Sequence, residues 1–156
     1  MNPAYAQTLR ELLRTQEIAA LGTLHDGQPF VSMVPFALLP GNANFIIHVS
    51  QLATHTKDMV SSPNVSLLVV APPAPGITAQ ALARITVQGQ ALPCTDASHA
   101  AAKAAYLSRF PHSAKMFGFA DFSLFVIAPS SIRFVGGFGQ ATSITPETFA
   151  DVMGQS

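Results

Sequence analysis

The sequence predicts one mainly β domain, an antiparallel barrel that is closed or nearly closed, with flanking helices. Its 156 residues suit a single domain. About six or seven short β-prone runs are separated by turn signals, and only two helical segments interrupt them. No internal repeat, low-complexity tract or linker divides the chain. We therefore expect residues 1–156 to fold as one unit.

A helix and a β-hairpin are predicted first. The helix covers about residues 3–14 with Asn2 as its N-cap, and we expect it to cover one end of the barrel. The runs Ile18–Leu24 and Pro29–Leu38 are expected to pair, because the Asp26-Gly27 dipeptide between them is a strong tight-turn signal. The barrel then extends over about residues 16–137, and residues 142–156 form a C-terminal tail.

A strand that runs directly into a polar helix start is the most informative feature. Phe45–Val49 is apolar and β-prone, and Ser50 can act as N-cap for a helix over about residues 51–61. The first N–H groups of a helix lack intrahelical acceptors and, with the helix dipole, attract anions. Helical spacing predicts an inward face formed by Leu52, His55, Thr56, Met59 and Val60.

Two polar side chains on that face, His55 and Thr56, need hydrogen-bond partners if they point inward. A bound phosphoryl group would supply them, and so would neighbouring backbone groups. The segment alone leaves both interpretations open.

The second half of the chain predicts further strands, helices and loops. Pro72–Thr78 cannot pair regularly because it is rich in proline, so we expect a loop of variable position that lies free or over a ligand. Arg84, Thr86 and Gln88 alternate with apolar residues, so one face of their strand meets water or a ligand. The predicted strands are Val65–Ala71, Ala83–Leu92, Phe122–Ile127 and Ile132–Val135. Asp96 is the predicted N-cap of one helix, and Pro111 opens a short second one.

Three glycines surround Phe138 in the segment RFVGGFGQA, residues 133–141. They permit close approach of something flat or bulky, or they mark a β-bulge and an exit turn. The Gly136–Gly139 segment is not a phosphate loop, because it lacks the Lys-Ser/Thr of that motif.

Charged residues make up only 10% of the chain, against roughly a quarter in an ordinary soluble domain. We therefore expect part of the surface to be a subunit interface, the alternative being a neutral monomer with a polar uncharged exterior. The formal net charge is zero and no basic stripe is present, which argues against nucleic acid or an anionic membrane as partner. The expected partner is a small molecule.

Cysteine usage and hydropathy predict a cytoplasmic protein. The single cysteine, Cys94, cannot form an internal disulfide, and we interpret it as a small packing residue. The N-terminus lacks a signal-peptide pattern, and no apolar run approaches the roughly 18 residues of a membrane span.

No catalytic group or metal site can be assigned from the sequence. His25 in a turn, His99 on a helix and His112 after a proline lack metal-ligand spacing with a cysteine or carboxylate. No nucleophile-elbow sequence is present, so hydrolase chemistry is disfavoured.

The ordered segments PFVSMVPFAL, FIIHVSQLATHTKDM, PNVSLLVV, ARITVQGQA, FADFSLF and RFVGGFGQA resemble the pyridoxamine 5'-phosphate oxidase-like FMN-binding split barrels. The resemblance is closest to their haem-utilisation (HugZ-like) branch and covers residues 15–144. It implies a six-stranded antiparallel split β-barrel that forms a homodimer with two FMN sites in the subunit interface.

The resemblance also implies roles for individual residues. Residues 32–35 would line the flavin ring and ribityl chain, and residues 48–50 of the next strand would face them. The helix start at residues 54–57 would approach the phosphate, and the Gly136–Gly139 loop would lie near the flavin. Lys57 is equally interpreted as a solvated lysine, because it points away from the apolar helix face. The implied cofactor-binding residues are Ser32, Met33, Val34, Pro35, His48, Val49, Ser50, Thr54, His55, Lys57 and Arg84.

Two departures from the family pattern bear on function. Ser32 stands where vitamin B6 oxidases carry an arginine, and Thr54-His55 replaces their Arg-Lys phosphate pair. Haem-degrading members use a C-terminal histidine as iron ligand, whereas no histidine follows Ala141 here. The sequence therefore favours an FMN-dependent oxidoreductase of unknown substrate. The alternatives are a non-catalytic flavin or haem binder, or a haem-degrading protein that lacks the C-terminal histidine ligand.

Overall fold

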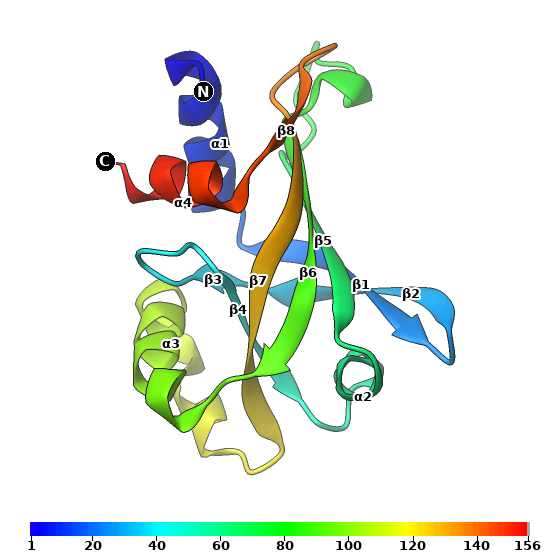
Figure 1. Cartoon of the computed structure of the whole chain (residues 1–156), viewed down its shortest axis with the longest axis vertical. Helices are drawn as coiled ribbons and strands as arrows, with labels where there is room; N and C mark the ends of the chain where they lie inside the picture. Colours follow the sequence, from blue (N-terminus) through cyan, green and yellow to red (C-terminus); the bar gives the residue numbers. More distant parts are fainter. Residues whose placement is uncertain (156) are drawn as a thin grey trace.

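Eight antiparallel strands form one curled sheet in the computed structural model, which describes residues 1–155 (Figure 1). The strand order is β2-β1-β5-β6-β7-β4-β3, and β8 pairs with β7. The predicted class, mainly β with flanking helices in a split barrel, is confirmed, although eight strands are present where six or seven were expected. The strands are β1 (Ile18–His25), β2 (Gln28–Pro35), β3 (Ala37–Leu38), β4 (Phe45–Ser50), β5 (Asn64–Val70), β6 (Arg84–Pro93), β7 (Phe122–Val135) and β8 (Ala141–Ile144).

Helices cover the ends and one flank of this sheet (Figure 1). The α-helices are α1 (Pro3–Thr15), α2 (Thr54–Ser61), α3 (Asp96–Arg109) and α4 (Pro146–Gly154), and the short 3-10 helices are η1 (Ala79–Ala81) and η2 (Pro111–Gly118). Helix α1 begins as predicted, since the Asn2 side chain accepts a hydrogen bond of 2.8 Å from the backbone N–H of Ala4. Within residues 1–155, no helix combines the length and apolar character needed to cross a membrane.

The β1–β2 hairpin also forms as predicted. Asp26 and Gly27 have φ values of 50° and 77°, and His25 pairs with Gln28 across the turn. Two consecutive positive φ values match the twist of the flanking strands, which is why Asp-Gly is favoured there.

β7 is one continuous strand of 14 residues, so the prediction of two strands with a break between them is wrong. The irregularity lies within β7 itself: Gln88 and Gly89 of β6 pair with Ser131 and Pro129, so Ser130 is an extra residue in β7. A side chain at Gly89 would collide with the carbonyl of Ala128. Glycine allows the two backbones to approach closely, and pairing continues past the proline.

The C-terminal segment is not a simple tail. Residues 141–144 form β8 along β7, and α4 follows with Thr145 as N-cap, whose hydroxyl accepts a bond of 3.1 Å from the N–H of Thr148. Phe149 and Val152 of α4 are buried in the main core. Residues 141–154 are therefore part of the folded unit.

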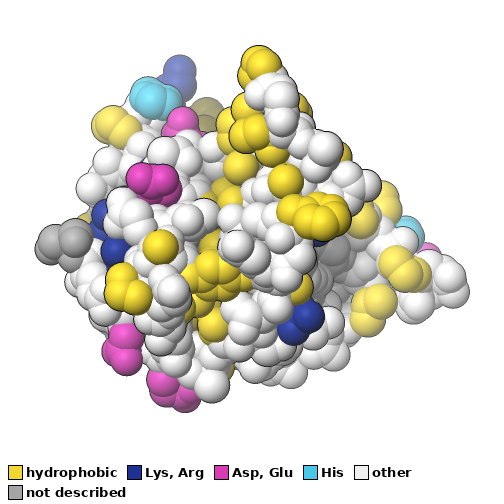
Figure 2. All heavy atoms as spheres, turned by 90° about the horizontal axis from the view of Figure 1, so that it is seen from above, with side chains coloured by type: hydrophobic (Ala, Val, Ile, Leu, Met, Phe, Trp, Pro, Cys, Tyr) yellow, Lys and Arg dark blue, Asp and Glu magenta, His cyan; other side chains and the backbone are white. Residues whose placement is uncertain are grey.

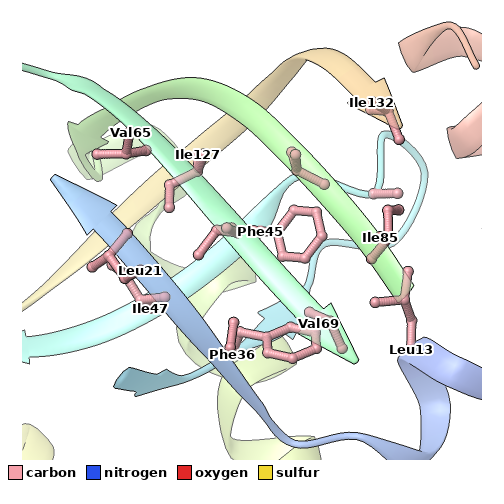
Figure 3. Packing of buried hydrophobic residues seen from close by; sticks show 14 of the residues in the cluster. Leu13, Leu21, Phe36, Phe45, Ile47, Val65, Val69, Ile85, Ile127 and Ile132 are labelled. Carbon is pink, nitrogen blue, oxygen red and sulfur yellow. The ribbon is translucent and has the colours of Figure 1, made fainter. Parts of the chain in front are cut away.

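The main core fills the inside of the curled sheet (Figure 3). Leu21, Ile47, Val69 and Ile85 project inward from separate strands, and Leu13 of α1 closes one end. Burying each such side chain contributes about 1.5–3 kcal/mol. A second, smaller cluster lies between α3 and the outer side of β4 and β7 and contains Ala37, Ile46, Ala102, Tyr106, Phe110 and Leu124.

Candidate functional site

Helix α2 begins later than the sequence predicts. Its first residue is Thr54 and its N-cap position is Ala53, not Ser50. The Ser50 hydroxyl instead accepts a 3.1 Å bond from the Leu52 N–H and donates a 2.7 Å bond to Asp121. Through these two hydrogen bonds, the Ser50 side chain holds residues 50–53 in a turn and joins this turn to Asp121, the residue before β7.

The predicted inward face of α2 is correct in part. Thr56 and Met59 are buried, but Leu52 and Val60 are 75% and 71% exposed. Leu52 lies outside the helix, and Val60 lies on its solvent side. Asp58 takes an inward place that the apolar pattern does not predict, and it is only 5% exposed.

Ser32 and His55 come together between β2 and the start of α2. The Ser32 hydroxyl lies 2.9 Å from Nδ1 of His55, and both side chains are half-buried. Burial lowers the pKa of His55, and the nearby Asp58 carboxylate only partly opposes this. His55 is therefore neutral at pH 7. With Nδ1 engaged, Nε2 is the ring nitrogen that a ligand can reach.

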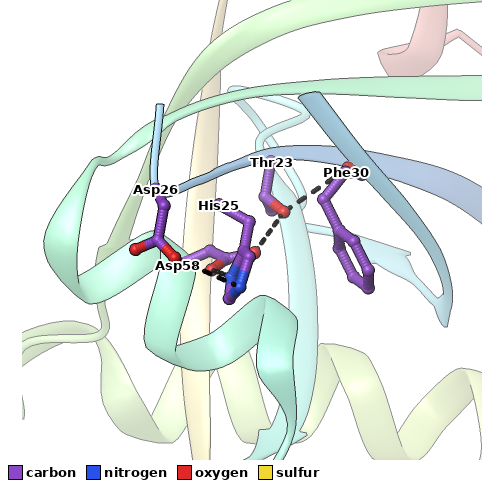
Figure 4. A network of polar contacts seen from close by, with 5 residues as sticks. All are labelled: Thr23, His25, Asp26, Phe30 and Asp58. Carbon is purple, nitrogen blue, oxygen red and sulfur yellow. Dashed lines mark hydrogen bonds and ion pairs between the residues drawn. The ribbon is translucent and has the colours of Figure 1, made fainter. Parts of the chain in front are cut away.

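A second polar contact joins β1 to α2, and the sequence pattern does not predict it (Figure 4). Asp58 of α2 lies 2.7 Å from Nδ1 of His25 and accepts a 2.8 Å bond from the Thr23 hydroxyl. The sequence places His25 in a turn and does not predict this carboxylate partner. A hairpin residue and a helix residue 33 positions apart have no spacing rule that would pair them. A buried aspartate inside an otherwise apolar helix face is the signal that could have found the contact.

The pKa of His25 is raised and the pKa of Asp58 is lowered, as expected for an ion pair. The hydrogen bond and the charge of Asp58 raise the pKa of His25. Burial alone would raise the pKa of Asp58, but hydrogen bonds from His25 and Thr23 and the nearby histidines bring it below its usual value. The two shifts favour an imidazolium paired with a carboxylate.

The strand β4 residues proposed to face the cofactor point in different directions. His48 stacks on Phe117 with ring centroids 3.8 Å apart, in the cluster under α3, so it turns away from Ser32 and His55. Val49 is buried in the main core, and Ser50 bonds to Asp121. Each of the three serves a structural contact in this protomer.

The β2 residues alternate across the sheet. Met33 is 56% exposed on the face opposite Ser32, whereas Val34 belongs to the core and Pro35 is exposed. Ser32 is therefore the β2 residue that meets α2.

The residues of the proposed phosphate site do not converge within one protomer. Thr54 is exposed at the helix start, and Lys57 lies about 200° around the helix from His55. Arg84 donates to the carbonyls of Gln80 and Leu82 over 3.1 Å and 3.0 Å. It pairs with Val70, at the end of β5 farthest from α2, so about 20 Å of strand separates it from the helix.

The Gly136–Gly139 segment after β7 packs against an aromatic ring of the protein, that of Tyr5 in α1. A Cβ atom at Gly136 would lie 2.5 Å from the ring of Tyr5 in α1. The close approach permitted by this glycine is thus made by Tyr5. The neighbouring Phe138 is 75% exposed.

The described residues contain no group of three or more histidine, cysteine or acidic side chains placed to hold a metal ion. A cofactor that brings its own metal would need only one or two of these side chains.

The curled antiparallel sheet, with a polar helix start between β4 and β5, defines the class of split-barrel proteins. Within this class, the chain belongs to the CREG beta-barrel family, whose model matches residues 2–151. The resemblance to split barrels read from the sequence motifs is therefore confirmed.

Three relatives have descriptions that concern haem. The chain is 37% identical over 117 residues to the non-canonical heme oxygenase HOZ, chloroplastic, of Arabidopsis thaliana; the match covers 75% of this chain and 35% of that protein. It resembles the structure of a heme binding protein from Mycobacterium smegmatis with a TM-score of 0.85 and 30% identity, over 97% of this chain and 62% of that one. It also shares the fold of HutZ, the heme storage protein from Vibrio cholerae, with a TM-score of 0.68 and 22% identity, over 79% and 88% of the two chains. This chain thus spans about a third of the curated relative.

Proposed function

We propose that this protein binds haem and that His55 is the iron ligand contributed by this chain. The observation that carries the proposal is the Ser32–His55 contact of 2.9 Å. Two relatives at 30% identity or above are described as a heme oxygenase and a heme binding protein, which supports the choice of ligand.

The chemistry of His55 fits iron. A neutral imidazole is the form that ligates a metal, and burial keeps His55 in that form. Metal-binding histidines commonly hold their second ring nitrogen in a hydrogen bond, which fixes the ring and leaves the other nitrogen free. Ser32 supplies this hydrogen bond. Phe30, two residues away on the same face of β2 and 36% exposed, offers an aromatic surface to a macrocycle.

The residues of this chain would bind and orient the haem, and the haem would supply iron for oxygen chemistry when bound. Enzyme and storage protein differ in one assay. If the haem absorbance is lost after a reductant and oxygen are added to the loaded protein, the chain is an oxygenase. If the absorbance persists, the chain is a non-catalytic haem binder.

We propose that the protein forms a homodimer through the outer face of the sheet. Val31 and Met33 are 68% and 56% exposed on β2, and Leu68 and Val70 are 39% and 41% exposed on β5. Residue pairing aligns Met33, Ala20 and Leu68 in one row across three strands. In Figure 2 the charged side chains are few and scattered, and hydrophobic groups reach the surface. Such a surface is typical of a protein that buries one face against a partner subunit.

A groove of about 790 Å³ continues this apolar face across the hairpin of β1 and β2, the ends of β5 and β6 and the middle of β7. Its lining includes Leu24, Val31, Gly89 and Leu92 and contains no charged residue. Such a surface suits a second copy of the chain or the apolar part of a ligand held between two copies.

Titration with haemin tests the haem proposal. We expect a Soret band for the wild-type protein, and His55→Ala should shift the band and weaken haemin binding by tenfold or more, about 1.4 kcal/mol. Ser32→Ala should give a smaller loss, because it removes only the orienting bond. His99→Ala, on the exposed side of α3, is the matched control. An unchanged spectrum in His55→Ala would remove His55 as the ligand.

An FMN-dependent oxidoreductase is the second candidate. Thr54 and His55 at the start of α2 can donate to a phosphate, and charge-assisted bonds of this kind are strong. Arg84 would have to come from the partner subunit, given its position at the far end of the sheet. We expect His55→Ala or Arg84→Ala to weaken FMN affinity by about 1–3 kcal/mol. Reduction of bound flavin by NADH or NADPH would distinguish an oxidoreductase from a binder.

A further inference from the structure

The tip of the β1–β2 hairpin extends beyond the rest of the sheet (Figure 1). The β1–β5 ladder ends at the Gly22–Ser66 pair, so residues 23–30 pair only with one another. Among the described residues, β2 has β1 as its only strand partner. The tip therefore depends on contacts other than strand pairing to hold its position.

Three polar contacts tie this hairpin to α2. Ser32 bonds to His55. Thr23 and His25 both bond to Asp58 (Figure 4). Thr23 and His25 lie in the part of the hairpin that has no other strand beside it. The Asp58 carboxylate uses one oxygen for each of them, over 2.8 Å and 2.7 Å, and is almost fully buried.

We infer that Asp58 is a positioning residue: its carboxylate fixes the hairpin tip against α2 and thereby sets the position of Ser32 relative to His55. The ligand-binding consequence of this inference rests on the proposed function. The structural consequence, a hairpin held by one buried carboxylate, is independent of any ligand. We call the Thr23–Asp58–His25 group the hairpin latch.

The latch depends on charge as well as geometry. His25 faces Asp58 and, at 3.6 Å from Nε2, the exposed Asp26. From α2, His55 acts on Asp58, and Lys57 lines the same recess. Asp58 raises the pKa of His25, so the charged pair is complete below the ordinary histidine pKa of about 6.5 and is lost as pH rises through the raised value. Neutral His25 can still donate Nδ1–H, so the latch loosens at high pH without opening fully.

Amide hydrogen exchange of the ligand-free protein tests the latch. Asp58→Asn keeps the shape of the side chain but removes its charge, and we expect exchange in residues 28–33 to be about tenfold faster or more. Exchange there should also accelerate with rising pH more than intrinsic exchange does in the wild type, and should follow the intrinsic rate in Asp58→Asn. Asp26→Asn, which removes the neighbouring exposed carboxylate, is the control and should behave as wild type.

Two further variants keep the inference testable if Asp58→Asn folds poorly. Thr23→Val and His25→Gln each remove one contact, and their effects on exchange should be non-additive because both act through Asp58. Unchanged exchange in Asp58→Asn, or wild-type exchange in both of the other variants, would overturn the inference.

A ligand-binding experiment tests the hairpin latch separately from the proposed function. If haemin or FMN binds, Asp58→Asn should lower its affinity about tenfold and Asp26→Asn should not. If neither probe binds while exchange responds as expected, the proposed function fails and the latch stands. If a probe binds with equal affinity to wild type and Asp58→Asn, the positioning role is wrong.

Discussion

The phenol of Tyr5 lies against the backbone of Gly136, whose N–H donates a 3.3 Å hydrogen bond to the Tyr5 hydroxyl. The Tyr5 ring also packs edge-on against Phe134, with centroids 4.9 Å apart. The first helix is thus joined to the end of the longest strand. The glycine segment that the sequence marks for close approach is used, in this protomer, to hold α1.

Gly136→Ala should therefore destabilise the protein by about 1–3 kcal/mol, because the new methyl group overlaps the Tyr5 ring. Urea unfolding measures this change. In a Tyr5→Ala background the same substitution should cost much less, since the two positions are coupled. Gly118→Ala is the control, as its Cβ would meet nothing within 4 Å. An equal loss at both glycines would contradict the steric argument.

Phe149 tests whether the C-terminal helix belongs to the folded unit. Its side chain is fully buried, and its ring is nearly parallel to that of Phe45 at 6.0 Å. Phe149→Ala should lower the free energy of unfolding by about 3–5 kcal/mol. Phe138→Ala removes an aromatic ring that is 75% exposed and should change stability by less than about 0.5 kcal/mol. A small effect at Phe149 would mean that α4 contributes little to the core.

The elements that depend on interactions between nearby residues are predicted correctly from the sequence. The elements that depend on contacts between distant residues are not. Asn2, Asp26 and Gly27 act on residues two to four positions away, so the sequence predicts the first helix and the hairpin turn correctly. The later start of α2 depends on Ser50 bonding to Asp121, 71 positions away. The C-terminal helix likewise depends on Phe149 finding a place beside Phe45.

The candidate site shows the same difference between local and long-range interactions. Helical spacing places His55 and Thr56 correctly, because it depends only on local geometry. It does not pair Asp58 with His25, and it does not reveal that His48 turns toward Phe117, because both depend on how the sheet curls. The sequence motifs alone therefore do not predict what each β4 side chain contacts.

Acid should destabilise the protein through His48. Burial among aromatic rings lowers the pKa of His48, and repulsion from His99 adds to the shift. The unfolded chain binds this proton at about pH 6.5, so the stability contribution is full above that pH and is lost as pH falls toward the lower folded value. The unfolding free energy of wild type should fall more between pH 7 and 5 than that of His48→Gln. His112→Gln, at an exposed position, should keep the wild-type profile.

A charge in the exposed apolar face of the sheet should prevent dimer formation. Leu68 lies in the row with Ala20 and Met33, so Leu68→Lys would place an ammonium in the centre of the proposed interface. Burying an unpaired charge is costly, and we expect light scattering after gel filtration to show a monomer where wild type elutes as a dimer. Val60→Lys adds the same charge at a residue that is 71% exposed on α2, outside this face, and should remain dimeric. A wild-type protein that is monomeric at tens of micromolar, or a Leu68→Lys variant that stays dimeric, would place the interface elsewhere or exclude it.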